Sequence, residues 1–173
     1  MWKTGGSSSL GNWIEGNVSA MSDLVQVDPV ALLPTQAGCA VFLGNGDKSI
    51  VFYIEPAIGA SINDALSDRQ PPRPLTHDLF HDALRAFGAV VQRVVIVKVE
   101  SDVFFARLFI EAENEISQKL IVELDARPSD SIALAVRQQA PIYVVRDVWE
   151  GLKDMTNVLE ELRDKGMELE GGD

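Results

Sequence analysis

A short segment in the second half of the chain places several polar groups at the junction of a predicted strand and a predicted helix. Carboxylates can accept protons or bind hard cations, and a guanidinium can bind two anionic oxygens at once. Side chains at such a turn can converge while a rigid scaffold holds them, so we expect a functional site here. The candidate catalytic residues of this segment are Asp125, Arg127 and Asp130, and Ser129 is a candidate for substrate binding.

The two elements that would position this segment are visible in the composition of the chain. Residues 120–124 form an apolar run typical of a strand. Pro128 suits the first position of a helix, because its missing N–H group would have no partner there. This helix is expected to bury an apolar side formed by Ile132, Leu134, Ala135 and Val136.

Apolar runs and turn residues predict the elements that come earlier in the chain. Residues 39–43 and 49–54 flank a turn-forming segment, which predicts a β-hairpin. Helical spacing of apolar residues predicts a short helix over 56–66, and three prolines make residues 68–75 a stiff connector. The helix that follows is expected to bury an apolar stripe formed by Leu79, Phe80, Ala83, Leu84 and Phe87.

The remaining elements complete the expected fold. Strands are predicted over residues 90–99, 103–110 and 140–145. A final helix is predicted from Asp147, with an apolar stripe formed by Val148, Leu152, Met155, Leu159 and Leu162. A chain of 173 residues with 46% hydrophobic content suits one core rather than two. We therefore predict an α+β fold: a single compact domain with a mixed or mostly antiparallel sheet and helices packed on it.

The expected domain organisation is one folded unit with extensions at both ends. Residues 22–146 form the domain, and residues 1–21 are expected to be a flexible leader or an expression remnant. Residues 147–166 form an acidic amphipathic helix, and residues 167–173 a disordered tail. Without an apolar run of about 18 residues or a secretory signal, we expect no membrane contact and a cytoplasmic protein. The single cysteine, Cys39, fits a reducing compartment.

The charge of the chain bears on its partners. The net charge is −11, and the chain from residue 147 onward holds nine acidic and three basic residues. This balance argues against a general polyanion binder, because nonspecific affinity for nucleic acid comes from Lys and Arg. A local positive face on the central domain stays open, and its candidate residues are Arg69, Arg73, Arg107, Arg127 and Arg137.

The two halves of the chain resemble each other when shifted by 70 residues. The pair Ile54-Glu55 then lies over Leu124-Asp125, and each half reads as hairpin, carboxylate and helix. This pattern predicts an internal pseudo-repeat in which Glu55 and Asp125 occupy related places.

Four ordered motifs resemble the bifunctional nuclease domain family. They are Pro-Arg-Pro-Leu-Thr-His-Asp at 72–78, Phe-Phe-Ala-Arg-Leu at 104–108, the segment 125–135, and Pro-Ile-Tyr-Val at 141–144. The resemblance covers roughly residues 25–146 and implies a compact α+β domain that forms a homodimer and cleaves DNA, RNA or both. The chain departs from the family pattern at Ile58, where relatives carry a Glu.

The resemblance implies phosphodiester hydrolysis, which needs the phosphate charge neutralised, a water activated and the leaving oxygen stabilised. Mg²⁺ or Mn²⁺ is the expected cofactor, and no organic cofactor is expected. The candidate metal ligands are Asp125, Asp130, Glu55 and Asp78. Arg127 and Arg73 are expected to bind phosphate oxygens, and His77 is a candidate general base.

A structural interpretation of the same residues stays open. Asp130 would favour the start of its helix, and Asp125 and Arg127 would form a buried ion pair. A zinc site at His77 and His81 is rejected, because no third ligand is evident. Aromatic residues of the 103–110 strand are expected to pack in the core or an interface rather than stack on bases.

The corresponding alternative function is a non-enzymatic regulatory or protein-interaction module. In that case the acidic C-terminal helix would bind a protein partner or a second subunit. The net acidity and the residue at position 58 favour this alternative, whereas the motif match favours a nuclease.

Overall fold

A seven-stranded sheet forms the framework of the protein. The computed structural model describes residues 23–36, 38–113 and 118–165. The strand order is β3-β2-β1-β7-β4-β5-β6. Every neighbouring pair is antiparallel except β4 and β7, which are parallel. The strands are β1 (Leu24–Thr35), β2 (Gly38–Gly44), β3 (Ser49–Ile54), β4 (Ala89–Glu100), β5 (Val103–Glu113), β6 (Lys119–Ala126) and β7 (Ile142–Val145).

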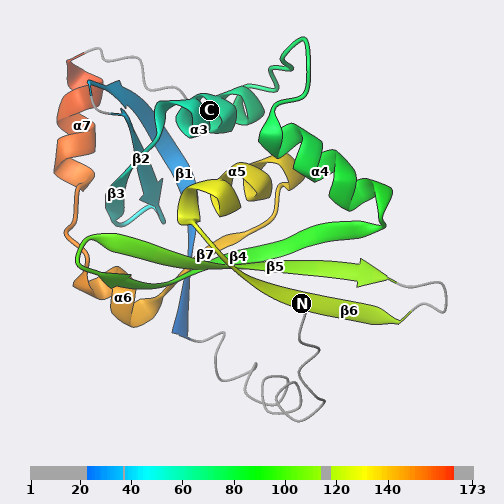
Figure 1. The fold of residues 1–173 in the computed structure, drawn as a ribbon. Coiled ribbons are helices and arrows are strands. Elements are labelled where there is room, and N and C mark those ends of the chain that lie inside the picture. The colour runs from blue at the N-terminus through cyan, green and yellow to red at the C-terminus, as the bar shows by residue number, and fades with distance from the viewer. Residues whose placement is uncertain (1–22, 37, 114–117, 166–173) are drawn as a thin grey trace.

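Five helices accompany the sheet in the described part of the chain, which confirms the α+β class. They are α3 (Pro56–Leu66), α4 (Thr76–Ala86), α5 (Pro128–Gln138), α6 (Arg146–Gly151) and α7 (Thr156–Asp164). Figure 1 shows α3, α4 and α5 on the same side of the sheet, with α7 beside the strands β1 to β3. No helix among the described residues is long and apolar enough to cross a membrane.

The main core lies between the sheet and the helices α3 and α5. Its fully buried side chains include Ile62 of α3, Ile132 of α5 and Ile96 of β4. A smaller apolar cluster, which includes Phe42 and Leu159, joins β1 and β2 to α7. Strand β2 is buried along its whole length, because helices cover it on both sides.

A glycine sets how closely α3 approaches the sheet. A Cβ atom built on Gly59 would lie 2.6 Å from the Cβ of Cys39 in β2 and 2.7 Å from its sulfur. Only glycine lets two backbones approach this closely without displacing a neighbour. The contact therefore fixes α3, and with it the residue that precedes α3, against the sheet.

The two edge strands of the sheet end close together in space. Strands β3 and β6 stand at opposite ends of the strand order. Nevertheless Glu55, just after β3, and Arg127, just after β6, form an ion pair of 3.0 Å. The rings of Phe52 in β3 and Phe104 in β5 also lie 5.4 Å apart. The sheet is thus curved enough for its two ends to face each other.

The apolar stripe predicted for α4 is not buried. No residue of α4 is buried, and the exposed fractions of Leu79 and Phe87 are 64% and 85%. The reason is that α4 contacts α5 through polar groups, so Leu79 and Phe80 lie on the outer side, while Leu84 is half-buried against the main core.

The single C-terminal helix predicted from Asp147 is two helices, α6 and α7, with a break between them. The ammonium of Lys48 donates to the carbonyl oxygens of Trp149 at 2.6 Å and Leu152 at 2.7 Å. Met155 then donates its N–H to the carbonyl of Ser49 at 2.7 Å. These bonds tie the break to the turn between β2 and β3. The predicted leader (residues 1–21) and the predicted tail (residues 167–173) lie outside the described residues, as does residue 166 at the end of the predicted helix region.

The internal repeat predicted from the sequence is not shown by the structure. Glu55 is the residue immediately before α3, whereas Asp125 lies inside β6, three residues before the first residue of α5. The two carboxylates therefore do not occupy related places.

Candidate functional site

Two strand-to-helix turns meet at the candidate site. Glu55 and Arg127 each occupy the residue before a helix, and a proline follows each of them at the first helical position. Their backbone angles are nearly identical, with φ −63° and ψ 142° for Glu55 and φ −67° and ψ 141° for Arg127. The extended conformation is the one that a residue before proline prefers. Local sequence thus places each side chain at a turn, and the curvature of the sheet makes them neighbours.

Arg127 binds carboxylates on two sides. Its Nε donates to Oδ2 of Asp130 at 2.7 Å and its Nη2 approaches Oδ1 at 3.4 Å, while its Nη1 donates to Glu55 at 3.0 Å. Hydrogen bonds from Arg127 to Asp130, and then to Glu55, raise the pKa of the guanidinium further above its ordinary value. The three bonds use three of the five N–H groups, and the side chain is 60% exposed. Two N–H groups remain for a ligand.

A chain of polar contacts continues from Asp130 into the protein. His77 Nε2 lies 3.1 Å from Asp130 Oδ1, and His77 Nδ1 lies 3.3 Å from the hydroxyl of Ser61. Arg137 donates to the same hydroxyl at 2.8 Å and to Asp78 at 2.6 Å. Because the carboxylate of Asp130 only accepts, a neutral His77 would donate from Nε2 and accept the Ser61 hydroxyl proton at Nδ1. Through these contacts the polar side of α4 packs against α5.

The carboxylates of this chain are held in the ionised form. Partial burial of Asp130 disfavours its charge, but hydrogen bonds from Arg127 and His77 outweigh burial and lower its pKa. Burial also acts on Asp78, and there the bonds from Arg137 and from the N–H of Leu75 lower the pKa. Both residues are therefore anions at neutral pH, and weak bases.

A groove of about 480 Å³ opens beside the ion pair of Glu55 and Arg127. We call it the base groove; its walls come from the end of β3, the turn between β4 and β5, and the start of α5. Glu55, Arg127 and Ser129 line it, whereas Asp130 and His77 do not. His77 is only 14% exposed and lies behind Asp130. A ligand in the groove would therefore meet Glu55 and Arg127 first.

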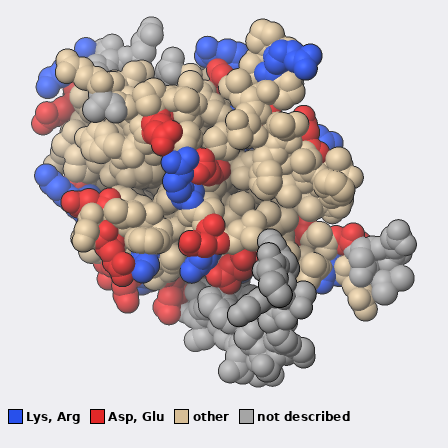
Figure 2. Space-filling model, in the orientation of Figure 1, with Lys and Arg blue, Asp and Glu red and all other residues tan. Residues whose placement is uncertain are grey.

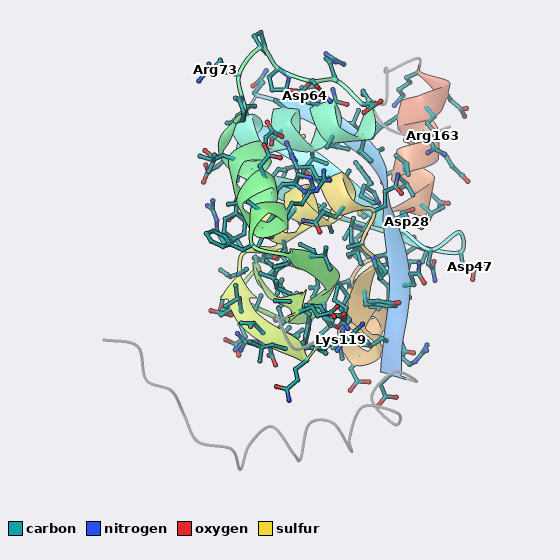
Figure 3. The ribbon with its side chains drawn as sticks, turned by 90° about the vertical axis from the view of Figure 1, so that its right-hand side faces the viewer. Asp28, Asp47, Asp64, Arg73, Lys119 and Arg163 are labelled. Carbon is teal, nitrogen blue, oxygen red and sulfur yellow. The ribbon has the colours of Figure 1, made fainter. Side chains whose placement is uncertain are left out.

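Two of the predicted site residues lie elsewhere. Asp125 accepts a hydrogen bond of 2.6 Å from Arg107, which stands directly opposite it in β5. The predicted buried ion pair between Asp125 and Arg127 is therefore wrong, because Asp125 is exposed and the strand register gives it another partner. Arg73 projects from the connector between α3 and α4, at the outside of the molecule (Figure 3).

The candidate arginines do not build a positive face. Each of the residues Arg69, Arg107, Arg127 and Arg137 has an acidic partner within 4 Å. On the face drawn in Figure 2, acidic and basic side chains lie next to one another, and the basic ones form no continuous patch. Any affinity for a phosphate must therefore arise from individual groups rather than from a broad field.

The four predicted metal ligands do not converge. Among the residues that the structure describes, no group of three or more His, Cys, Asp or Glu side chains could hold a metal ion. Glu55 and Asp130 both bind Arg127, while Asp78 binds Arg137 and Asp125 binds Arg107. The expected Mg²⁺ or Mn²⁺ cofactor therefore stays a prediction, which the cleavage assay tests.

Sequence reasoning missed two members of the polar chain and one wall of the groove. Ser61 lies on the buried side of α3, where a serine among apolar residues was the only signal. Arg137 was considered only for a positive face, although it is 7% exposed and fully engaged. Nothing in the sequence singled out Tyr53, which lines the base groove.

Comparisons with known proteins agree with the motif resemblance. Residues 41–155 match the family model described as Bifunctional nuclease domain. An uncharacterized protein of Mycobacterium tuberculosis is 38% identical over 100 residues, which covers 58% of this chain and 56% of the relative. Bifunctional nuclease 1 of Arabidopsis thaliana is 32% identical over 80 residues, or 46% of this chain and 24% of the relative. Bifunctional nuclease 1 of Oryza sativa subsp. japonica is 29% identical over 84 residues, or 49% and 25%.

Proposed function

Because the chain belongs to the bifunctional nuclease domain family, we propose that it hydrolyses phosphodiester bonds of DNA, RNA or both at Glu55 and Arg127. The plant relatives are named bifunctional nucleases, which supports the reaction class. The observation that carries the assignment of residues is the exposed guanidinium of Arg127, with two N–H groups left for a ligand, beside an exposed carboxylate in one groove.

Arg127 is the phosphate-binding residue of this proposal. Its two remaining N–H groups can bind two nonbridging oxygens of one phosphate, in the geometry that a guanidinium favours. Negative charge grows on those oxygens as water attacks phosphorus. A donor that is already held in place stabilises that charge without reorganising, which is where such groups contribute most to the rate.

Glu55 is the candidate base. Its side chain is 65% exposed and lines the groove beside Arg127, so a water molecule can reach it. In the proposed step, water forms a bond to phosphorus, its proton passes to Glu55, and the bond to the leaving oxygen breaks. The leaving oxygen takes a proton from solvent. Asp130 suits this role less well, because its lowered pKa makes it a weaker base.

Asp130 and His77 are positioning residues. Asp130 receives two donors from Arg127 on one side and His77 on the other, so it fixes the plane of the guanidinium. Ser129, the second residue of α5, lines the groove and is a candidate for a substrate contact there. No step of the proposal is routed through a metal ion, since the four carboxylates do not converge.

Arg127→Ala tests the proposal, and Arg107→Ala is its matched control. Arg107 also binds two carboxylates, Glu123 and Asp125, but it lies outside the base groove. Cleavage of labelled single- and double-stranded DNA and RNA is measured with Mg²⁺, with Mn²⁺ and with EDTA. We expect the Arg127 variant to lose activity about 100-fold, the loss typical of one removed oxyanion donor.

The control should retain activity, because an exposed ion pair contributes little to the fold. Equal losses in both variants would contradict the role of Arg127. Cleavage by the wild-type protein in none of the conditions would contradict the nuclease proposal itself. Activity that disappears in EDTA would overturn the mechanism without a metal step.

The outer side of α4 favours a second candidate function, a protein-interaction module that forms a homodimer. Leu79 and Phe87 are mostly exposed there, and Leu120 and Ile121 of the edge strand β6 are exposed as well. Exposed apolar side chains on a helix or on an unpaired edge strand are typical of surfaces that contact another chain. A partner at the acidic C-terminal helix stays a prediction, and Leu159 of α7 is already buried in the protein.

A further inference from the structure

We propose that the base groove binds one unpaired nucleobase, which stacks on the ring of Tyr53 while Arg127 holds the adjacent phosphate. The inference rests on the proposed function and names its substrate class, a single-stranded nucleic acid. It also assigns a binding residue, Tyr53, that neither the motifs nor the mechanism uses.

Tyr53 is an exposed aromatic residue near the end of β3, just before the candidate site. Its side chain is 72% exposed, whereas the preceding Phe52 is 6% exposed, because alternate residues of β3 point to opposite faces. Tyr53 lies two residues before Glu55, and both line the base groove. The ring is therefore open to a ligand, and the residue borders the same groove as the groups assigned to the reaction.

The rest of the groove is apolar at the end where a base would lie. The ring centres of Phe104 and Phe52 lie 5.4 Å apart, and this contact holds Phe104 in place. Val103 is 55% exposed and also lines the groove, at the turn between β4 and β5. A volume of about 480 Å³ falls within the range of sites for small organic ligands. An aromatic base would cover side chains that water now contacts.

The charges of the groove match one orientation of a nucleotide. Arg127 is the only basic residue that lines the groove among the described residues, so the phosphate must lie at that end. Asp102 also lines the groove, from the turn between β4 and β5, and a carboxylate there repels a phosphate but accepts hydrogen bonds. The exocyclic amino groups of adenine and cytosine are donors that such carboxylates can bind. A nucleotide with its phosphate at Arg127 and its base beside Tyr53 therefore places an anion next to the guanidinium and hydrogen-bond donors next to a carboxylate.

The geometry selects a single strand. In a duplex both faces of a base are stacked, so its ring cannot lie on a tyrosine unless the base leaves the helix. Proteins that bind single strands combine cationic contacts to the backbone with aromatic side chains under the bases. The net charge of −11 leaves no broad electrostatic attraction, so the stacked base must supply much of the affinity.

Binding of a fluorescent single-stranded phosphorothioate DNA, which resists cleavage, tests the inference in the full-length protein. Fluorescence anisotropy compares the wild type with Tyr53→Ala, Tyr53→Phe and Phe87→Ala. Phe87 is the matched control, because it is an aromatic residue exposed at 85% that does not line the groove. We expect Tyr53→Ala to weaken binding about tenfold, and the other two variants to stay within about twofold.

A second probe separates stacking from phosphate binding. The same oligonucleotide made without bases should bind Tyr53→Ala and wild type equally, and the blunt duplex should bind the wild type more weakly than the single strand. Arg127→Ala should weaken binding of both single-stranded probes. Unchanged affinity in Tyr53→Ala, an equal loss in Phe87→Ala, or no binding of the single strand would overturn the inference.

The outcomes also separate this inference from the nuclease proposal. Tyr53-dependent binding by a protein that cleaves no substrate would support the base groove and contradict the nuclease. Suppose instead that cleavage depends on Arg127 but the affinity for the single strand is unchanged in Tyr53→Ala. This result would support the nuclease proposal and contradict base binding in the groove.

Discussion

Replacing Arg137 by Met should destabilise the protein strongly, because this arginine joins three helices. Its guanidinium is 7% exposed and donates to Asp78 of α4, to the carbonyl and hydroxyl of Ser61 in α3, and to the carbonyl of Ala133 in α5. Methionine has a similar length and fills the space, but it offers no donor. The substitution removes the guanidinium partner of the Asp78 carboxylate and of the Ser61 hydroxyl, which keep only their contacts with the N–H of Leu75 and with His77.

The magnitude follows from the burial of both partners. Removing one member of a buried charge pair costs about 3–5 kcal/mol, because the other charge stays desolvated. Asp78 is 24% exposed, so water compensates it in part, and we place the loss in unfolding free energy at about 3 kcal/mol. For a chain of this size that corresponds to a drop in melting temperature of about 6–12 °C.

Urea denaturation of wild type, Arg137→Met and Arg107→Met measures the difference. Arg107 also forms two ion pairs, but it is 37% exposed, so its loss should cost about 1 kcal/mol or less. Arg137→Lys should fall between the two, since lysine keeps the charge and loses the planar fork. If Arg137→Met costs no more than Arg107→Met, the polar contact between the helices is not what holds α4.

Three further predictions concern pH, packing and assembly. Partial burial disfavours the charges of Asp78 and Asp130, but hydrogen bonds from Arg137 and Arg127 outweigh it and lower the pKa values of both carboxyls. The stability that they contribute is therefore present above the ordinary Asp pKa of about 4 and is lost as the pH falls through their folded-state pKa values. Urea midpoints at acid pH should therefore fall less steeply in the double variant Asp78→Asn, Asp130→Asn, and an unchanged slope would contradict this. Gly59→Ala should lose about 1–3 kcal/mol of unfolding free energy, because the new Cβ would clash with Cys39. Gly151→Ala should lose far less, because no atom lies within 4 Å of the position of its new Cβ. Equal losses in the two variants would refute the packing argument. Light scattering should show a homodimer that Leu79→Glu with Phe87→Glu converts to a monomer, and a wild-type monomer would count against the α4 surface.

Most elements were predictable because they depend on neighbours in the sequence. The β2–β3 hairpin, α3 and the strand-to-helix turn at Pro128 follow from turn residues, periodicity and proline chemistry. The prediction that the apolar stripe of α4 is buried was wrong for a related reason. Its spacing shows that the helix has an apolar side, but periodicity cannot tell whether another part of the same chain covers that side.

Site residues were predictable only where one turn contains them. Arg127, Ser129 and Asp130 lie within four positions, and the structure keeps all three at the start of α5. Asp125 has the same local signal and yet points to Arg107, because the register of β5 and β6 decides which side of the sheet it occupies. Register depends on hydrogen bonds between strands, which no single segment encodes.

The sequence by itself determined the family, the class of fold and the presence of a charged turn before α5. Only the tertiary structure decided that Glu55, 72 positions away in the sequence, is the partner of Arg127. It also placed Tyr53 beside them and put His77 behind Asp130. The physical reason is the curvature of the sheet, which makes its two edges neighbours, and curvature arises from the packing of all seven strands with α3 and α5 rather than from any one of them.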